Sequence, residues 1–189
     1  MKRFVALVVV GCCLAGCQSP NGSDPPLANV HDLEGHAVNP FANSQSKATA
    51  LIFIRTDCPI SNRYAPEIER LKTKYAPEVT FWLVYPDPDV TSQQIRDHVK
   101  EFSLSVAPIQ DPQHQLVHKA AATVTPEAAV FLPDGVEIYR GRIDDRFVDF
   151  GKARPAATQH DLDSILQAVV AGKAVAKTRT QAIGCYISD

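Results

Sequence analysis

Two continuous apolar runs, residues 48–54 and 79–85, dominate the hydrophobic pattern of the chain. Both are rich in β-branched and aromatic residues, and continuous rather than alternating runs indicate strands buried on both faces of a sheet. The segment between them has an apolar stripe at helical spacing, formed by Tyr64, Ile68, Leu71 and Tyr75. Such a stripe predicts an amphipathic helix. Strand, helix and strand together predict a parallel crossover unit.

The pattern then predicts a second helix, a short strand and a third helix. Thr91 followed by Gln94 fits a capping box for a helix that runs through Phe102. Its expected buried side consists of Ile95, Val99 and Phe102. A short strand near 106–109 and a helix near 113–122 follow.

The end of the folded region has clearer signals. Residues 128–132 and 136–140, joined by a Pro-Asp-Gly turn, predict an antiparallel hairpin. Thr158 with Asp161 predicts the cap of a last apolar helix, which we expect to end at Gly172. At the other end of the domain, turn chemistry around Gly35 predicts a small hairpin or edge strands over 31–38.

The N-terminus has the pattern of a secretory signal peptide. Two basic residues precede the apolar run 4–10, which is too short for the roughly 20 residues of a membrane span. The Leu-Ala-Gly-Cys sequence that ends at Cys17 resembles the processing box of bacterial lipoproteins. This resemblance implies cleavage before Cys17, a lipid on that residue and a membrane-anchored protein of the cell envelope. Ordinary secretion, with cleavage at a nearby small residue, is the alternative.

We therefore divide the chain into four segments: the signal peptide 1–16, a flexible tether 17–29, one folded domain 30–172 and a C-terminal tail 173–189. Gln18 is not the aspartate that tends to retain lipoproteins at the inner membrane, which favours the outer membrane in a cell that has one. The tether is rich in Ser, Pro, Asn and Gly, as flexible linkers are.

Composition supports one domain and excludes one class of partner. The 189 residues are 45% hydrophobic, which is enough for one compact core. The formal net charge of -2 and a pI near 6.3, without a cluster of Lys and Arg, argue against nucleic acid. Processing would remove two cysteines and occupy Cys17, so Cys58 and Cys185 remain. Outside the cytoplasm such a pair can be a structural disulfide, a redox couple or part of a metal site.

Cys58 has the sequence context of a reactive thiol. It follows the first predicted strand directly and precedes Pro59, which opens the first predicted helix. The positive end of the helix dipole, together with Arg55 or Arg63, should lower the pKa of the Cys58 thiol below about 8.5. A thiolate at this position could attack a disulfide.

The order of these elements resembles the thioredoxin fold over residues 30–172. Pro66 lies eight positions after Cys58, where thioredoxins carry the proline that kinks the active-site helix. Thr125-Pro126 opens the hairpin strand, where the family has a cis-proline that faces the cysteine. The longer segment 88–122 resembles the inserted strand and helix of peroxiredoxins and of periplasmic thiol-disulfide oxidoreductases.

The resemblance implies an α/β domain with a central mixed sheet flanked by helices, and thiol-disulfide chemistry without a cofactor. Its partners would be protein thiols or disulfides in the cell envelope. Under the same resemblance, Pro126 turns the Thr125 backbone toward the substrate, and a simple trans turn is the alternative. Glu127 lies close enough to be a proton acceptor, although we expect a solvated residue at the start of a strand.

Two departures from the family pattern restrict the chemistry. Ser61 stands where a dithiol oxidoreductase has its second cysteine, so this motif has one thiol. Leu51 and Arg55 stand where peroxiredoxins require a proline and a threonine, which argues against efficient peroxidase activity.

Cys185 is therefore the candidate second thiol. The tail that carries it has ample reach at about 3.3 Å per residue, so its docking and release could accompany oxidation and reduction. A static disulfide or a free thiol is the alternative. The predicted catalytic residues are Cys58, Cys185 and Pro126, and the predicted substrate-binding or thiolate-stabilising residues are Pro59, Ser61, Arg63 and Thr125.

Two other functions stay open at this stage, and no metal ligand is assigned. Thioredoxin-like copper-delivery proteins use two cysteines and a histidine, and this chain offers His98, His114, His118 and His160. A binding module without turnover is the other possibility, because of Ser61. The charged run 140–146 is expected to be a solvated loop, with reception of the tail as the alternative.

Overall fold

The computed structural model describes residues 27, 29–43 and 45–188. The expected signal peptide 1–16, the lipidation site Cys17 and nearly all of the tether lie outside the described residues. No helix in the described part of the chain is long and apolar enough to cross a membrane.

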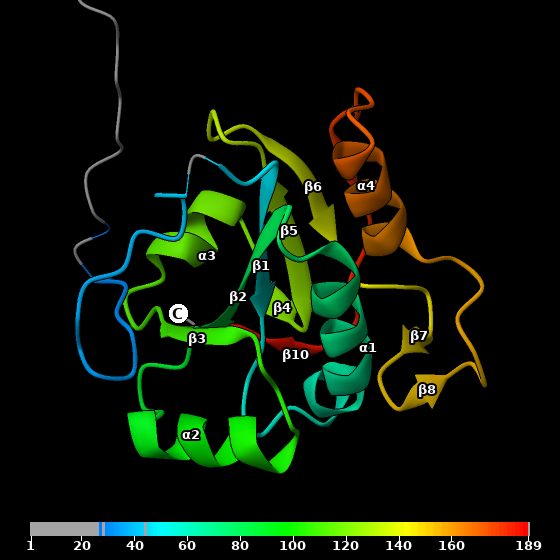
Figure 1. Ribbon diagram of the computed structural model, residues 1–189. Coiled ribbons are helices and arrows are strands. Elements are labelled where there is room, and N and C mark those ends of the chain that lie inside the picture. The colour runs from blue at the N-terminus through cyan, green and yellow to red at the C-terminus, as the bar shows by residue number, and fades with distance from the viewer. Residues whose placement is uncertain (1–26, 28, 44, 189) are drawn as a thin grey trace, which may run out of the picture.

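A six-stranded mixed sheet forms the centre of the domain, in the order β3-β2-β1-β5-β6-β9 (Figure 1). Its strands are β1 (Ala48–Phe53), β2 (Val79–Tyr85), β3 (Ala107–Gln110), β5 (Glu127–Phe131), β6 (Glu137–Gly141) and β9 (Thr178–Arg179). The first three are parallel to one another, whereas β5 is antiparallel to both β1 and β6. The predicted crossover unit and the predicted hairpin are both present.

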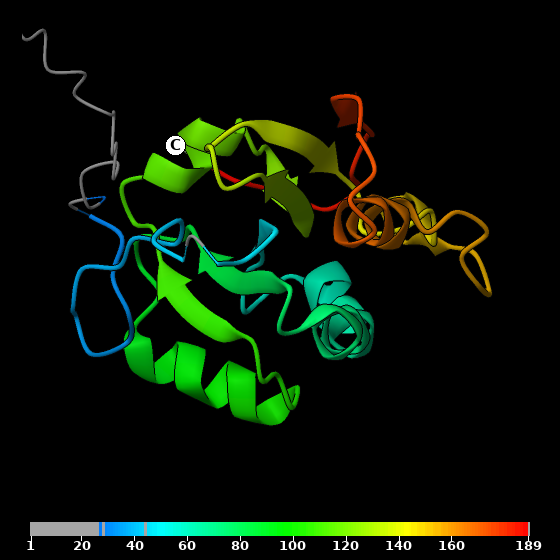
Figure 2. The ribbon, with the colours of Figure 1, turned by 45° about the horizontal axis from the view of Figure 1, so that its top comes forward.

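Helices cover both faces of the sheet (Figure 2). They are α1 (Pro59–Tyr75), α2 (Ser92–Glu101), α3 (Gln115–Ala120) and α4 (Asp161–Val170). One core cluster joins β1 to α1, α2 and α4, and the other joins it to α3. Along β1, Ile52 faces the first cluster and Leu51 and Phe53 the second. This strand is buried on both faces, as its unbroken apolar run predicted.

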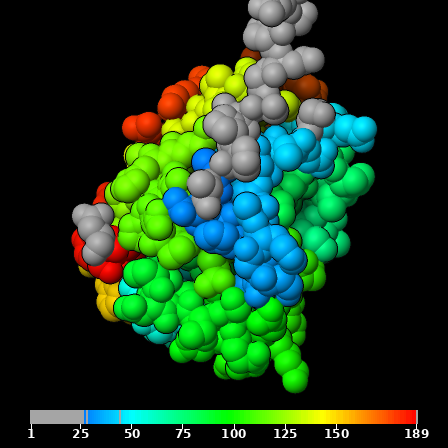
Figure 3. All heavy atoms as spheres, turned by 90° about the vertical axis from the view of Figure 1, so that its left-hand side faces the viewer, coloured from blue at the N-terminus to red at the C-terminus, as the bar shows by residue number. Residues whose placement is uncertain are grey.

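The segment before β1 covers the α3 side of the sheet, where it forms the blue part of the surface in Figure 3. Val30 is fully buried, and His31 exchanges two backbone hydrogen bonds with Gln110. The Phe41 ring meets the Phe131 ring edge-on, with centroids 5.1 Å apart. The predicted small hairpin is present as a bridge between His31 and Ala37.

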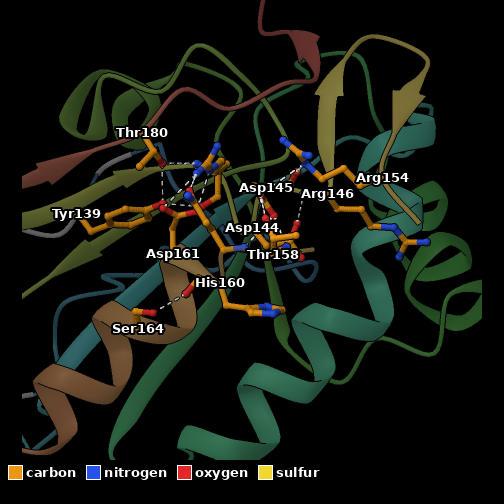
Figure 4. Close-up of polar contacts among 12 residues, drawn as sticks. Tyr139, Asp144, Asp145, Arg146, Arg154, Thr158, His160, Asp161, Ser164 and Thr180 are labelled. Atoms are coloured by element: carbon orange, nitrogen blue, oxygen red, sulfur yellow. Dashed lines mark hydrogen bonds and ion pairs between the residues drawn. The ribbon is translucent and has the colours of Figure 1, made fainter. Parts of the chain in front are cut away.

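The two predicted helix caps have different outcomes. Thr91 and Gln94 form the expected capping box of α2. Thr158, however, does not cap α4, which begins after His160. The reason is the buried Asp145 carboxylate, which accepts hydrogen bonds from the Thr158 backbone and hydroxyl at 2.6 and 2.5 Å (Figure 4). These bonds, led by that from the hydroxyl, hold the pKa of Asp145 below its usual range.

The charged run 140–146 is not the solvated loop that we expected. Asp144 and Asp145 are buried, and Tyr64 of α1 donates to Asp144 Oδ1 at 2.5 Å. Arg142 binds Asp161 of α4 at 2.7 Å. The loop therefore joins α1 to α4. Its charged side chains bind partners that are distant in the sequence, whereas the sequence suggested ion pairs within the run.

Four short strands complete the structure: β4 (Val124–Thr125), β7 (Phe147–Asp149), β8 (Lys152–Ala153) and β10 (Cys185–Tyr186). The C-terminal tail enters the domain twice, since β9 pairs with β6 and β10 pairs with β4. Between these strands the Thr180 hydroxyl contacts the Tyr139 hydroxyl at 2.8 Å and accepts from the Arg142 backbone at 3.1 Å (Figure 4). The tail is thus packed against the sheet.

Gly141 provides a test of this attachment. It has a φ of 150°, and a Cβ at this position would overlap the backbone oxygen and hydroxyl of Thr180. We expect Gly141→Ala to displace the tail and to lower the free energy of unfolding by about 1–3 kcal/mol more than Gly135→Ala. Gly135 is the matched control because its φ is also positive, at +81°, but its Cβ would meet nothing within 4 Å.

Denaturant unfolding and limited proteolysis of the tail measure the two effects. Equal stability of the two variants, with equal protection of the tail, would contradict the role given to Thr180.

Candidate functional site

The first cysteine lies where β1 passes into α1. After Phe53 the chain leaves the sheet, and Cys58 adopts the N-cap position of α1 with φ -86° and ψ 109°. Pro59 takes the first helical position, where its missing N–H costs no hydrogen bond. Cys58 is fully buried, so its sulfur lies at the positive end of the helix and out of contact with solvent.

The second cysteine reaches the same point from the far end of the chain. In the antiparallel pairing of β10 with β4, Cys185 lies opposite Thr125. The Thr125–Pro126 peptide bond is cis, as the resemblance implied. Cys185 Sγ lies 2.8 Å from Cys58 Sγ although the residues are 127 positions apart, and both cysteines are free thiols. A formed disulfide has an S–S distance of about 2.05 Å.

The two sulfurs differ in proton affinity. Burial raises the pKa of the Cys58 thiol, but hydrogen bonds from the side chains of Cys185 and Ser61 and from their backbones outweigh it and leave the pKa below its ordinary value. Burial and the hydrogen bond to Cys58 raise the pKa of Cys185 to about 12. Of the two thiols, Cys58 therefore loses its proton first, and Cys185 keeps its proton to higher pH.

The remaining predicted site residues occupy different surroundings. Ser61 is buried in the first turn of α1, and its hydroxyl has no hydrogen-bond partner of good geometry among the described residues. Thr125 lies beside the sulfurs, and its carbonyl accepts a hydrogen bond from the Cys58 thiol at 3.0 Å. Arg63 is exposed on α1, and its action on the thiolate stays a prediction. Arg55 forms ion pairs with Asp57 and Asp87 at 3.1 and 3.2 Å.

Glu127 is not the solvated residue that we expected at the start of a strand. It is buried and accepts hydrogen bonds from the backbone N–H groups of Thr123 and Val124, at 2.7 and 3.4 Å. Its carboxylate therefore fixes the backbone of β4, on which Cys185 docks.

A buried polar chain behind Cys58 was not found from the sequence. Asn62, in the first turn of α1, donates to the carbonyl of Thr56 at 3.2 Å and binds His98 Nε2 at 2.9 Å. His98 Nδ1 in turn binds the Tyr85 hydroxyl at 2.9 Å. Burial lowers the pKa of His98 and raises that of Tyr85, so both side chains stay neutral near pH 7. The chain ties the loop before Cys58 to α2 and β2.

The spacing of residues in α2 did contain a signal for the buried position of His98. His98 follows Ile95 by three positions, and the two are buried on the same face of the helix. The sequence pattern had assigned that face to Ile95, Val99 and Phe102, and all three do pack against the core, with His98 among them. A histidine among apolar positions at helical spacing is thus a candidate for a buried hydrogen-bonding role.

Among the described residues, none of the histidines considered for copper forms a metal-binding group with the sulfurs. His98 is engaged as described, and His114 binds the Pro86 carbonyl at 2.8 Å. Within the part of the chain that the structure describes, one group of at least three His, Cys, Asp or Glu side chains has its ligand atoms close enough together to hold a metal ion: Glu67, Asp144 and His160. Neither cysteine belongs to it, so the described residues offer the sulfur pair no third ligand of these kinds.

Comparison with known proteins gives relatives in structure. No family model and no curated protein matches the sequence. An uncharacterised conserved protein of Geobacillus kaustophilus is 23% identical, with a TM-score of 0.74, over 87% of this chain and 89% of that chain. A hypothetical protein of Sinorhizobium meliloti is also 23% identical, with a TM-score of 0.71, over 84% of this chain and 88% of that chain.

A secreted disulfide oxidoreductase of Mycobacterium tuberculosis is 19% identical, with a TM-score of 0.53, over 75% of this chain and 93% of that chain. At identities this low, the structural likeness shows a common fold alone. The strand order, the cis-proline facing the cysteine at the start of α1 and these likenesses agree. The chain has the thioredoxin fold, as a central mixed sheet flanked by helices.

Proposed function

We propose that this protein is a thiol-disulfide oxidoreductase that acts through the Cys58 thiolate, with Cys185 as its second thiol. The observation that carries the proposal is the contact of the two sulfurs at 2.8 Å. In the reaction, the two thiols of the pair give two electrons and two protons to an external disulfide. The pair becomes a disulfide and the external partner becomes two thiols. The reverse reaction oxidises a dithiol partner.

The electrostatic asymmetry of the pair supports this chemistry. Thiolate is the reactive form of cysteine, and the lowered pKa of Cys58 increases its thiolate fraction near pH 7. The sequence argument against efficient peroxidase activity still applies, because Leu51 and Arg55 replace the residues that peroxiredoxins use.

The cellular setting is part of the proposal. The signal-peptide pattern and the lipoprotein box at Cys17 support a lipid-anchored protein of the cell envelope, with the outer membrane favoured where one exists. Its partners would then be envelope proteins with thiols or disulfides. The secreted oxidoreductase among the structural neighbours is consistent with this setting.

The first test is formation of the disulfide. After oxidation with diamide and blocking of free thiols, mass spectrometry of non-reduced peptides should find Cys58 linked to Cys185. Dithiothreitol should remove the link, and the variant Cys185→Ser should not form it. If the wild-type pair stays unlinked under oxidation, the proposed couple does not exist.

The second test asks which hydrogen bonds lower the pKa of Cys58. Cys185→Ala removes a hydrogen bond that favours the charged form of Cys58, so the pKa of Cys58 should rise relative to wild type. Ser61→Ala should also raise it, for the same reason. The ultraviolet absorbance of the thiolate during a pH titration measures the effect in a buried residue, with Cys58→Ser as the blank. An unchanged pKa in both variants would refute the assigned cause.

The third test is turnover. Wild-type protein should accelerate the reduction of insulin disulfides by dithiothreitol, and Cys58→Ser should fall to the uncatalysed rate, because serine cannot form the internal disulfide with Cys185. Equal rates for wild type and variant would leave a binding module without redox activity.

A further inference from the structure

We infer that the external thiol partner reacts with Cys185. Cys58 is then the sulfur that leaves when the internal disulfide opens and that bonds to Cys185 when the disulfide closes again. This inference rests on the proposed function and assigns the two sulfurs different roles within it. It reverses the order suggested by the sequence, in which Cys58 was the sulfur that met the partner.

Accessibility is the first reason. Cys58 is 0% exposed, whereas Cys185 is partly exposed. A surface pocket of about 770 Å³ opens beside the pair, and Cys185 contributes to its lining while Cys58 does not. A partner that approaches the docked structure from this pocket meets Cys185 first.

The surroundings of the pocket are suited to a protein partner. Phe150, at the turn between β7 and β8, and Tyr186 of β10 line it and are 65% and 81% exposed. Aromatic side chains are enriched in protein interfaces, where they supply large contact areas. Arg140, Asp149 and Glu127 also line the pocket, so it carries charges of both signs. The expected occupant is a cysteine-bearing segment of a dithiol protein.

The tail can stay docked during this exchange. Gly184 lies against the Thr125 carbonyl so closely that a Cβ would overlap it. The Ile187 backbone N–H donates to the Thr123 carbonyl at 3.0 Å. These contacts lie on either side of Cys185 in the sequence and hold it against β4. Its sulfur can therefore be attacked while the tail stays docked.

The chemistry of leaving groups is the second reason. In the first step, a partner thiolate attacks Cys185 Sγ of the oxidised pair, the internal S–S bond breaks, and Cys58 leaves as a thiolate. The second partner thiolate then attacks the partner sulfur of the mixed disulfide, which releases Cys185 and leaves the partner oxidised. Thiols of lower pKa leave faster, and Cys58 is the sulfur of lower pKa. An external disulfide regenerates the oxidised pair by taking up the two electrons.

Adduct mapping tests the assignment. The oxidised wild-type protein is mixed with a cysteine-containing peptide, quenched with acid, and then unfolded in denaturant with excess iodoacetamide, which labels the released thiol. Peptide mass spectrometry should place the mixed disulfide on Cys185 and the carbamidomethyl group on Cys58. The opposite distribution, or an equal one, would overturn the inference while the proposed function, which requires only the internal disulfide, would still stand.

The pocket is tested separately, with variants of residues that line it but do not carry a reacting sulfur. Phe150→Ala and Tyr186→Ala should slow oxidation of a reduced protein substrate, such as reduced insulin, at least several-fold. Phe150→Ala, which lies outside the β10–β4 pairing, should oxidise the small thiol N-acetylcysteine at the wild-type rate. Val136→Ala is the matched control, because Val136 is also an exposed apolar residue, at 52%, but does not line the pocket.

If the aromatic variants behave as Val136→Ala does with the protein substrate, the pocket is not the entry surface. Should the small thiol slow down in step with the protein substrate, the variants act on the sulfurs or the fold, and the pocket assignment fails as well.

Discussion

The pairing of β10 with β4 is the interaction on which the candidate site depends. It consists of two residue pairs, Cys185 with Thr125 and Tyr186 with Val124, and it brings two sulfurs from opposite ends of the domain into contact. Each partner needs separate support. Glu127 fixes the backbone of β4, and Thr180 attaches the tail to β6 before it reaches β4. Without the pairing, Cys58 would be a buried thiol at a helix start with no second sulfur.

The same contact decides which cysteine is charged. Burial alone raises the pKa of a thiol, because the thiolate loses its hydration. At Cys58 the donors from Cys185 and Ser61 outweigh this cost. Cys185 has no comparable set of donors, and it becomes the proton holder.

Positioning of the Cys58 loop involves parts of the fold that carry no sulfur. The chain from Tyr85 through His98 to Asn62 connects the inserted helix α2 with the loop before Cys58, and all its contacts lie between 2.9 and 3.2 Å. The inserted segment therefore supports the site as well as covering the sheet. On the other side, the loop after β6 binds α1 through the buried Asp144 and binds the segment before α4 through the buried Asp145.

The sequence by itself determined the elements and one half of the site. Unbroken apolar runs, helical spacing and the Thr91 cap depend on neighbours within a few residues, so five of the six strands in the central sheet, the four helices and the place of Cys58 at a strand end could be read from the chain. The cap at Thr158 could not, because Asp145 competes for its hydrogen bonds from across a loop. Only the tertiary structure brought Cys185 to Cys58 and set the order of their pKa values. A contact between residues 127 positions apart is fixed by strand pairing and burial in the folded chain, and the local pattern of residues contains no record of it.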